Sequence, residues 1–336
     1  TNVSAFDHQA LATALADATG ETVDPYHLPI NTPDFQATHI LDLRLDPLRL
    51  KFQAFDRDWE FDVDTAQLKA AEPVENAWVI SPDGSQAAFR REHDIWLRDL
   101  ASGQERALTQ DGEPFFRYGI PGSVWGNDGL LSVLPLQARW SPDGRLLFTV
   151  QLDQRQVKTL GEIQHVPLDG TLRPVTRQRK LAFAGDEHIE EYRLVIIEVS
   201  SGRSIDVNYG RVPITLGAMG GFFDNALAWW AADSTRAYFV DLDRYQKCAR
   251  VLEVDSRSGA VRLLFEEHSN THIDLLDNPL GSARLMPLPE SRELLWVSER
   301  SGWAHVYLYD LDSGELKNAV TSGEWLVRDE LIHFDA

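Results

Sequence analysis

The sequence contains a single cysteine, Cys248, among 336 residues. One thiol excludes an internal disulfide, and its place in "YQKCARVLEV" favours a small residue at the start of a strand over a reactive group. Long apolar runs are also absent, because no stretch of eighteen apolar residues occurs and the first thirty residues lack a basic segment followed by an apolar one. We therefore expect no membrane span and no signal peptide in this chain.

Positive charge is scarce. Lys and Arg number 32 against 52 Asp and Glu, which gives a formal net charge of −20. Such a chain lacks a general surface for neutralising phosphates, which excludes nucleic acid as an expected partner. The composition is otherwise that of a folded globular protein, with 43% hydrophobic and 25% charged residues.

The string Gly-x-Ser-x-Gly of a serine hydrolase nucleophile elbow is absent as well. The nearest string, "GSVWG" from Gly122, has its serine in the wrong place. We predict no catalytic residue and no cofactor in this chain.

The first segment with a clear pattern is "SAFDHQALATALADATG". It predicts one amphipathic helix capped by Ser4, with Phe6, Leu11 and Leu15 on about one face and Gly20 as the left-handed stop. The proline-rich stretch "VDPYHLPINTPDF" that follows predicts an extended linker.

From Ile40 onward, two strand modules alternate. One is a strand, an acidic and small polar turn and a second strand, as in "IWLRDLASGQERAL", "LVIIEVSSGRSIDV", "VLEVDSRSGAVRLL" and "VYLYDLDSGELKNAV". The other is a strand, a tight turn and a strand, as in "VISPDGSQAAFRR", "ARWSPDGRLLFTV", "AWWAADSTRAYFV" and "RLMPLPESRELLWV". This alternation predicts an all-β β-propeller of four-stranded antiparallel blades with a short N-terminal helix, rather than a β-sandwich.

The string "SPDG" occurs at residues 81–84 and again at 141–144. It predicts a type I turn in which Pro fixes φ, Asp bonds to nearby backbone and Gly adopts a left-handed conformation. Each copy is expected to join the inner strands of one blade. Tryptophans at positions 96, 140, 296 and 303 are expected at equivalent places in the core between blades.

The order "LATALADATG", "SPDGSQAAFRREHDIWLRDLASGQERALTQDGEP", "ARWSPDGRLLFTVQLDQRQV" and "LWVSERSGWAHVYLYDLDSGELKNAVTSGEWLVRD" is similar to the N-terminal domain of bacterial dipeptidyl peptidase IV relatives in the prolyl oligopeptidase family of serine peptidases. The resemblance implies an eight-bladed propeller followed by an α/β-hydrolase domain that holds the Ser-Asp-His triad. It predicts a helix and linker over residues 1–37 and, over residues 38–336, a propeller truncated before its last blades and that hydrolase domain.

The same resemblance indicates where peptide would bind. In dipeptidyl peptidase IV two adjacent glutamates ahead of a "WSPDG" turn capture the peptide's amine, but the matching stretch "RYGIPGSVWGNDGLLSVLPLQARWSPDG" has none. Asn127 and Asp128 are the weak substitutes there, and Trp125 is the candidate aromatic contact. The family's propeller arginine is missing from the matching "DVDTAQL". These departures favour broader peptide hydrolysis by the parent enzyme over strict dipeptide release.

Two further sets of residues are candidates from their pattern alone. Asp153 and Arg155 in "LDQRQV" follow the apolar strand "LLFTV" directly and are expected to point into the channel or toward the adjoining domain. "HIEE" from His188 and "HSNTHID" from His268 contain metal-ligand residue types, but surface polarity explains both better. We predict no metal site.

The sequence therefore predicts the non-catalytic propeller of a serine peptidase, which gates and orients short peptides for its own C-terminal hydrolase domain. A free-standing propeller that binds a protein partner is the alternative, and a propeller glycosidase is a third. Assembly of copies into a homo-oligomer, and the choice between cytoplasm and periplasm, stay open.

Overall fold

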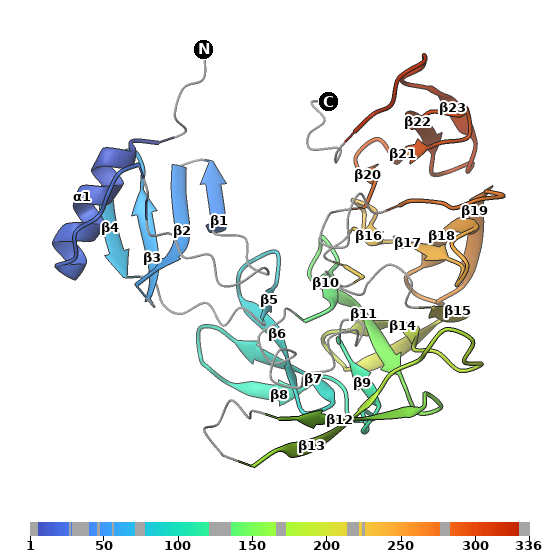
Figure 1. Ribbon diagram of the computed structural model, residues 1–336, viewed down its shortest axis with the longest axis horizontal. Coiled ribbons are helices and arrows are strands. Elements are labelled where there is room, and N and C mark those ends of the chain that lie inside the picture. The colour runs from blue at the N-terminus through green and yellow to red at the C-terminus, as the bar shows by residue number, and fades with distance from the viewer. Residues whose placement is uncertain are drawn as a thin grey trace. The chain divides into compact units, whose positions relative to one another are not determined.

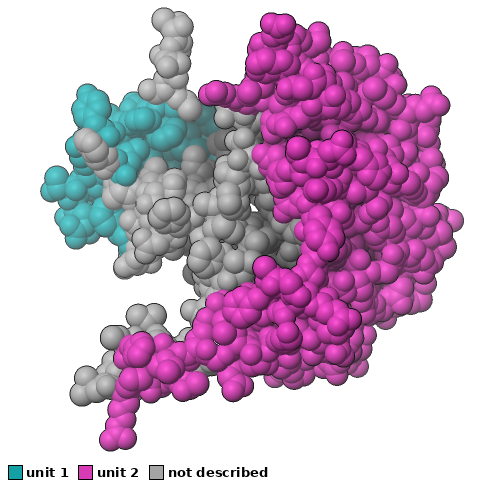
Figure 2. All heavy atoms as spheres, turned by 45° about the vertical axis from the view of Figure 1, so that its right-hand side comes forward, with its two compact units in different colours: residues 1–75 teal, residues 76–336 magenta. Residues whose placement is uncertain are grey.

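The computed structural model describes residues 6–26, 28, 40–45, 48–55, 57–70, 78–120, 136–165, 173–213, 222–223, 226–275 and 283–328. The chain divides into two compact units, residues 1–75 and 76–336, which Figure 2 shows in different colours. Each unit has a hydrophobic core of its own. The helix in the described part of the chain is too short and too polar to span a membrane.

The first unit begins with helix α1 (His8–Thr19). Its N-cap is Asp7, whose carboxylate accepts hydrogen bonds from the backbone N–H groups two and three residues on, at 2.9 and 3.0 Å. The prediction of Ser4 as the N-cap is therefore wrong. The cap lies one turn later, at Asp7, because its carboxylate accepts from those N–H groups. Gly20 ends the helix at φ 76°, as predicted.

Helix α1 packs on a four-stranded antiparallel sheet with the order β1-β2-β3-β4. The strands are β1 (Ile40–Leu45), β2 (Leu48–Ala54), β3 (Arg57–Asp62) and β4 (Gln67–Ala70). Leu11 and Leu15 are fully buried in one cluster with Phe52 and Trp59 of the sheet. The predicted apolar face of the helix is confirmed.

The described part of the second unit contains four antiparallel sheets whose strands follow chain order, together with a two-stranded hairpin (Figure 1). The first sheet consists of β5 (Val79–Ile80), β6 (Gln86–Arg91), β7 (Asp94–Asp99) and β8 (Glu105–Ala107). The second consists of β10 (Ala138–Trp140), β11 (Leu146–Asp153), β14 (Glu191–Glu198) and β15 (Arg203–Pro213), with β9 (Phe116–Tyr118) paired to β11. The third consists of β16 (Ala228–Trp230), β17 (Arg236–Leu242), β18 (Cys248–Asp255) and β19 (Val261–His268), and the fourth of β20 (Leu285–Leu288), β21 (Glu293–Ser298), β22 (His305–Asp310) and β23 (Leu316–Ala319). The hairpin is β12 (Thr159–Gln164) with β13 (Val175–Lys180).

Both predicted modules are confirmed as hairpins of these sheets. The tight-turn module forms the first two strands, as in β5–β6 and β10–β11, and the acidic-turn module forms the last two, as in β7–β8 and β14–β15. Each sheet contains one four-stranded blade, to which the second sheet adds β9, so the all-β propeller fold with a short N-terminal helix is confirmed.

The "SPDG" turns join the first two strands of their sheets, as predicted. The N–H of Gly84 donates to the carbonyl of Ser81 at 2.9 Å, and the carboxylate of Asp83 accepts from the Ser81 hydroxyl at 2.6 Å. Gly84 lies at φ 72°, in the left-handed region that favours glycine. The second copy repeats these bonds, including 2.6 Å from the hydroxyl of Ser141 to Asp143.

Tryptophans connect neighbouring sheets, although not at the equivalent positions predicted. Trp140 and Trp230 end the first strands of successive sheets. The indole N–H of Trp140 donates to the carbonyl of Val79 on β5 at 2.9 Å, and that of Trp230 donates to the carbonyl of Arg139 on β10 at 3.1 Å. Trp296 is fully buried but lies in a second strand. The prediction is wrong for Trp303, which is 41% exposed in the turn between β21 and β22.

Candidate functional site

Asp153 and Arg155 lie at one end of the second sheet of the larger unit. Asp153 is the last residue of β11, where it pairs with Phe116 of β9 on one side and Glu191 of β14 on the other. Arg155 begins the turn that follows the strand. This charged pair therefore lies at the end of a central strand.

The guanidinium of Arg155 lies between two carboxylates. It donates from Nε to Asp153 at 3.0 Å and from a terminal nitrogen to the same carboxylate at 2.8 Å. Its other terminal nitrogen lies 3.0 Å from Glu113. A second guanidinium, that of Arg211 on β15, lies 3.5 Å from Asp153. Two carboxylates and two guanidiniums thus form one network with no formal net charge.

An aromatic ring lies beneath both cations. The guanidinium carbon of Arg155 is 3.9 Å from the ring centre of Phe116, and that of Arg211 is 5.6 Å from it. Phe116 is held in place by a tight turn, in which it exchanges two backbone hydrogen bonds with Glu113. Such cation–π contacts attract both guanidinium groups to the ring of Phe116.

The buried side chain of Gln154, between Asp153 and Arg155 in the sequence, anchors the exposed network. Gln154 is 2% exposed, and its amide nitrogen donates to Glu190 at 3.0 Å while its backbone N–H donates to the carbonyl of Phe115 at 2.8 Å. Arg117 donates to the amide oxygen of Gln154 at 3.4 Å. These hydrogen bonds of the Gln154 amide and backbone anchor the turn that carries Arg155.

The electrostatics keep the pair ionised. Burial opposes ionisation of Asp153, but hydrogen bonds from Arg155 outweigh it, so the pKa of this carboxyl lies below its usual range. Hydrogen bonding to Asp153 raises the pKa of Arg155 despite some burial. The charges are therefore permanent near neutral pH. Of the two carboxylates that contact Arg155, Glu113 is the one that a ligand can most easily replace, because its side chain is 54% exposed.

Asp153 and Arg155 are candidates from the sequence, and the structure places Glu113, Phe116 and Arg211, which are not among those candidates, in contact with them. The signal for Phe116 was its place in "EPFFRY", where two aromatics precede an arginine. Arg211 gave no local signal, because only the pairing of β15 with β14 brings it to the end of β11. The other three predicted residues, Trp125, Asn127 and Asp128, lie outside the described residues.

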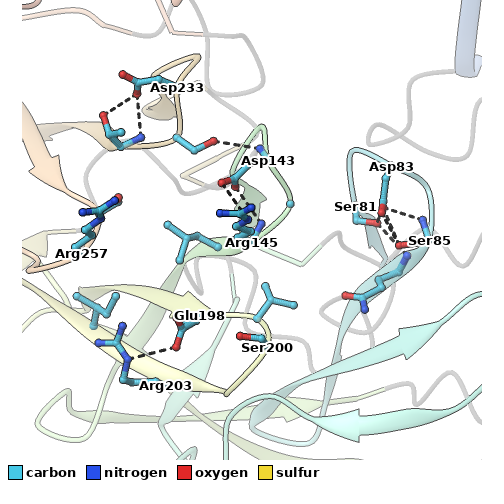
Figure 3. A pocket seen from close by; sticks show the side chains of 18 of the residues that line it. Ser81, Asp83, Ser85, Asp143, Arg145, Glu198, Ser200, Arg203, Asp233 and Arg257 are labelled. Carbon is cyan, nitrogen blue, oxygen red and sulfur yellow. Dashed lines mark hydrogen bonds and ion pairs between the residues drawn. The ribbon is translucent and has the colours of Figure 1, made fainter.

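A hollow of about 640 Å³ lies at the other end of the same sheet, between the turns of successive blades (Figure 3). Arg145, Arg203 and Arg257 line it together with Asp143 and Glu198. The carboxylates are engaged by the turns that form the hollow, as in the 2.5 Å bond from Ser201 to Glu198 and the bond from Ser141 to Asp143. These groups stabilise the turns, and we assign no ligand to the hollow.

Two stretches that begin at His188 and His268 contain the residues that were weighed as metal ligands from the sequence and set aside. Glu190 is turned inward to Gln154, and it therefore does not share a strand face with His188. His268 is the last residue of β19. Cys248 begins β18 as predicted, is 6% exposed, and has its pKa raised by burial.

The comparisons with known proteins agree with this fold. The family model of the dipeptidyl peptidase IV N-terminal region matches residues 48–336. A protein of Neosartorya fischeri named probable dipeptidyl peptidase 4 is 26% identical over 252 residues, which are 74% of this chain and 31% of that protein. Dipeptidyl peptidase 4 of Trichophyton rubrum is 22% identical over 258 residues, which are 74% of this chain and 30% of that protein.

Among solved structures, Porphyromonas gingivalis dipeptidyl peptidase 4 has a TM-score of 0.58 and 19% sequence identity, covering 93% of this chain and 44% of that chain. At this identity the likeness is one of fold. The chain spans about a third of the length of the curated relatives it matches. Since the family match extends over most of the sequence, the chain belongs to the family of dipeptidyl peptidase IV N-terminal regions.

Proposed function

We propose that this chain is the non-catalytic propeller of a dipeptidyl peptidase IV-like serine peptidase, which orients short peptides for a hydrolase domain outside the sequence given. The observation that carries the proposal is the family match over residues 48–336. The lack of a Gly-x-Ser-x-Gly string in all 336 residues supports it, because the nucleophile then has to come from elsewhere.

The network around Arg155 supplies the groups that peptide binding needs. The guanidinium of Arg155, which lies over the ring of Phe116, offers donors to a peptide carbonyl or carboxylate, and the exposed carboxylate of Glu113 offers an acceptor to an ammonium group. Because Gln154 and Asp153 fix the turn, a bound peptide gains these contacts without ordering the protein first. Held this way, the peptide enters the reaction in one orientation, which lowers the entropic part of the barrier.

Peptide binding by the 336-residue chain tests this proposal. Fluorescence anisotropy with a labelled peptide that begins Gly-Pro should show saturable binding, and Arg155→Gln should weaken it by about 10-fold, the loss of one charged hydrogen bond. Arg203→Gln is the matched control, because Arg203 forms an exposed ion pair at the other end of the same sheet. Lack of peptide binding by the wild type would favour the alternative, a scaffold for a protein partner. An equal loss in both variants would remove Arg155 from the site.

We also propose that copies of the chain associate through the hairpin β12–β13. Ile163 on this hairpin and Phe183 just beyond it are large apolar side chains that are 60% and 57% exposed, and a contact between copies would cover them. Sedimentation velocity should show a dimer that Ile163→Glu dissociates, whereas Leu316→Glu on the exposed strand β23 leaves it intact. A wild-type monomer at micromolar concentration would contradict this assembly.

A further inference from the structure

Three side chains with different donor atoms meet on the outer two strands of the third sheet in the larger unit. Cys248, the first residue of β18, lies directly opposite His268, the last residue of β19. Glu266 is two residues before His268 on β19, so both project from the same face of the strand. Among the residues that the structure describes, these three form the group of potential metal ligands.

Their donor atoms are already close to one another. Cys248 Sγ lies 3.9 Å from His268 Nε2, and His268 Nε2 lies 3.0 Å from a carboxylate oxygen of Glu266. All three donor atoms lie within 4.8 Å of one another. Tetrahedral zinc bonds of about 2.3 Å to sulfur and about 2.0 to 2.1 Å to nitrogen and oxygen place ligand atoms roughly 3.3 to 3.6 Å apart. Small side-chain rotations therefore suffice to reach that geometry.

The surroundings orient the carboxylate and leave the site accessible. Arg250, which pairs with Glu266 across the two strands, lies 3.5 Å from the second oxygen of that carboxylate. Because Arg250 contacts this second oxygen, the first oxygen of Glu266 remains directed at His268. Contacts from residues around a metal site commonly orient its carboxylate ligands in this manner. The side chain of His268 is 64% exposed, which gives an ion a path to the buried sulfur of Cys248.

We propose that Cys248, Glu266 and His268 bind one Zn²⁺ ion, with a water molecule as the fourth ligand. A thiolate and an imidazole select zinc over the hard cations Mg²⁺ and Ca²⁺, which prefer ligand sets made of oxygen alone. Since β19 is the edge strand of its sheet, the bound ion would cross-link that strand to β18 at the end where their pairing stops. The site is separate from the Arg155 network and does not depend on the proposed peptide function.

Metal titration of the chelator-treated 336-residue chain tests the proposal, with Co²⁺ as a spectroscopic probe for Zn²⁺. One equivalent of Co²⁺ should produce tetrahedral d–d bands and a thiolate charge-transfer band, and one equivalent of Zn²⁺ should abolish both. His268→Gln and Cys248→Ser should each weaken Zn²⁺ binding by at least about 10-fold.

The control is His272→Gln, a histidine four residues beyond His268 that is not in the cluster, and it should bind Zn²⁺ like the wild type. His268 is exposed, so His268→Gln keeps the fold, and circular dichroism checks this for Cys248→Ser. Absence of the thiolate band at one equivalent overturns the proposal. Binding that His268→Gln leaves unchanged, or that His272→Gln removes equally, overturns it as well.

Discussion

Single glycines set how closely neighbouring sheets approach. Gly259, in the turn between β18 and β19, lies at φ 71°, and a Cβ there would overlap the carbonyl oxygen of Asp206 on β15 of the preceding sheet. Gly314, in the corresponding turn of the next sheet, faces the carbonyl of Leu264 on β19 in the same way. The carbonyl of Gly259 also accepts a hydrogen bond from Asn208 at 2.8 Å. These turns therefore need glycine for space as well as for conformation.

Gly259→Ala should destabilise the chain more than Gly84→Ala does. Both glycines have nearly the same φ, 71° and 72°, but a Cβ at Gly84 meets nothing within 4 Å. Gly84→Ala should cost about 1 to 2 kcal/mol from backbone strain, and Gly259→Ala roughly 1 to 3 kcal/mol more from overpacking. Urea unfolding of the two variants measures the difference, and equal losses would show that the sheets can separate freely at this turn.

The turn carboxylate of Asp83 should make stability depend on acid pH. Hydrogen bonds, first from the Ser81 hydroxyl and then from Ser85, lower the pKa of Asp83 to about 2, below its value of about 3.9 in the unfolded chain. The lowered pKa means that this stabilisation is complete above about 4 and is lost as the pH falls through about 2.

Thermal unfolding of Asp83→Asn across this pH range checks the dependence. The variant should have a lower melting temperature than the wild type near neutral pH. This difference in melting temperature should vanish as the pH falls from about 4 to about 2. Asp143→Asn, in the second "SPDG" turn, should behave alike because Ser141 donates to Asp143 in the same manner. A difference in melting temperature that stays constant down to the lowest pH would mean that the carboxylate does not stabilise the turn.

At the scale of the elements, indole hydrogen bonds connect one sheet to the next. Trp229 and Trp230 are adjacent in β16 and are 3% and 4% exposed. The N–H of Trp230 donates to Arg139 of the preceding sheet at 3.1 Å, whereas that of Trp229 is buried without an acceptor among the described residues. Each ring also has an aromatic neighbour, Tyr238 for Trp229 and Phe148 for Trp230.

Phenylalanine at each position separates the hydrogen bond from the packing. Trp230→Phe should lower the free energy of unfolding by about 1 to 2 kcal/mol more than Trp229→Phe, since only the former loses a buried hydrogen bond. Denaturant unfolding of both variants provides the comparison. A larger loss for Trp229→Phe would show that packing area, and not the hydrogen bond, connects the sheets.

The hairpins could be predicted from the sequence because their signals are local. A turn such as "SPDG" needs only its own residues to form, and the strands beside it show their apolar character directly. The cap of α1 was displaced because Ser4 and Asp7 carry equally good capping groups, and only the structure shows that Asp7 is used. Trp303 was misplaced because a repeat in sequence does not fix which way a turn residue faces.

At the scale of the whole molecule, the candidate site depends on contacts between distant segments. The sequence places Asp153 and Arg155 at the end of a strand, but Glu113 comes from the preceding blade's final loop and Arg211 from a strand two positions across the sheet. The cluster of Cys248 and His268 instead lies within one hairpin, and the register of β18 and β19 brings the two residues opposite each other. Pairing over long sequence separations leaves no local signal, so Glu113 and Arg211 became visible as neighbours of Arg155 and Asp153 only in the fold.

We propose that this chain binds peptide but leaves bond cleavage to another domain. The most direct measurement incubates the purified 336-residue chain with a chromogenic Gly-Pro substrate and follows chromophore release, while the same compound competes with the labelled peptide for binding. The account predicts competition without release of chromophore. Release that rises with protein concentration and co-elutes with the chain would contradict it, because the chain would then carry the chemistry itself.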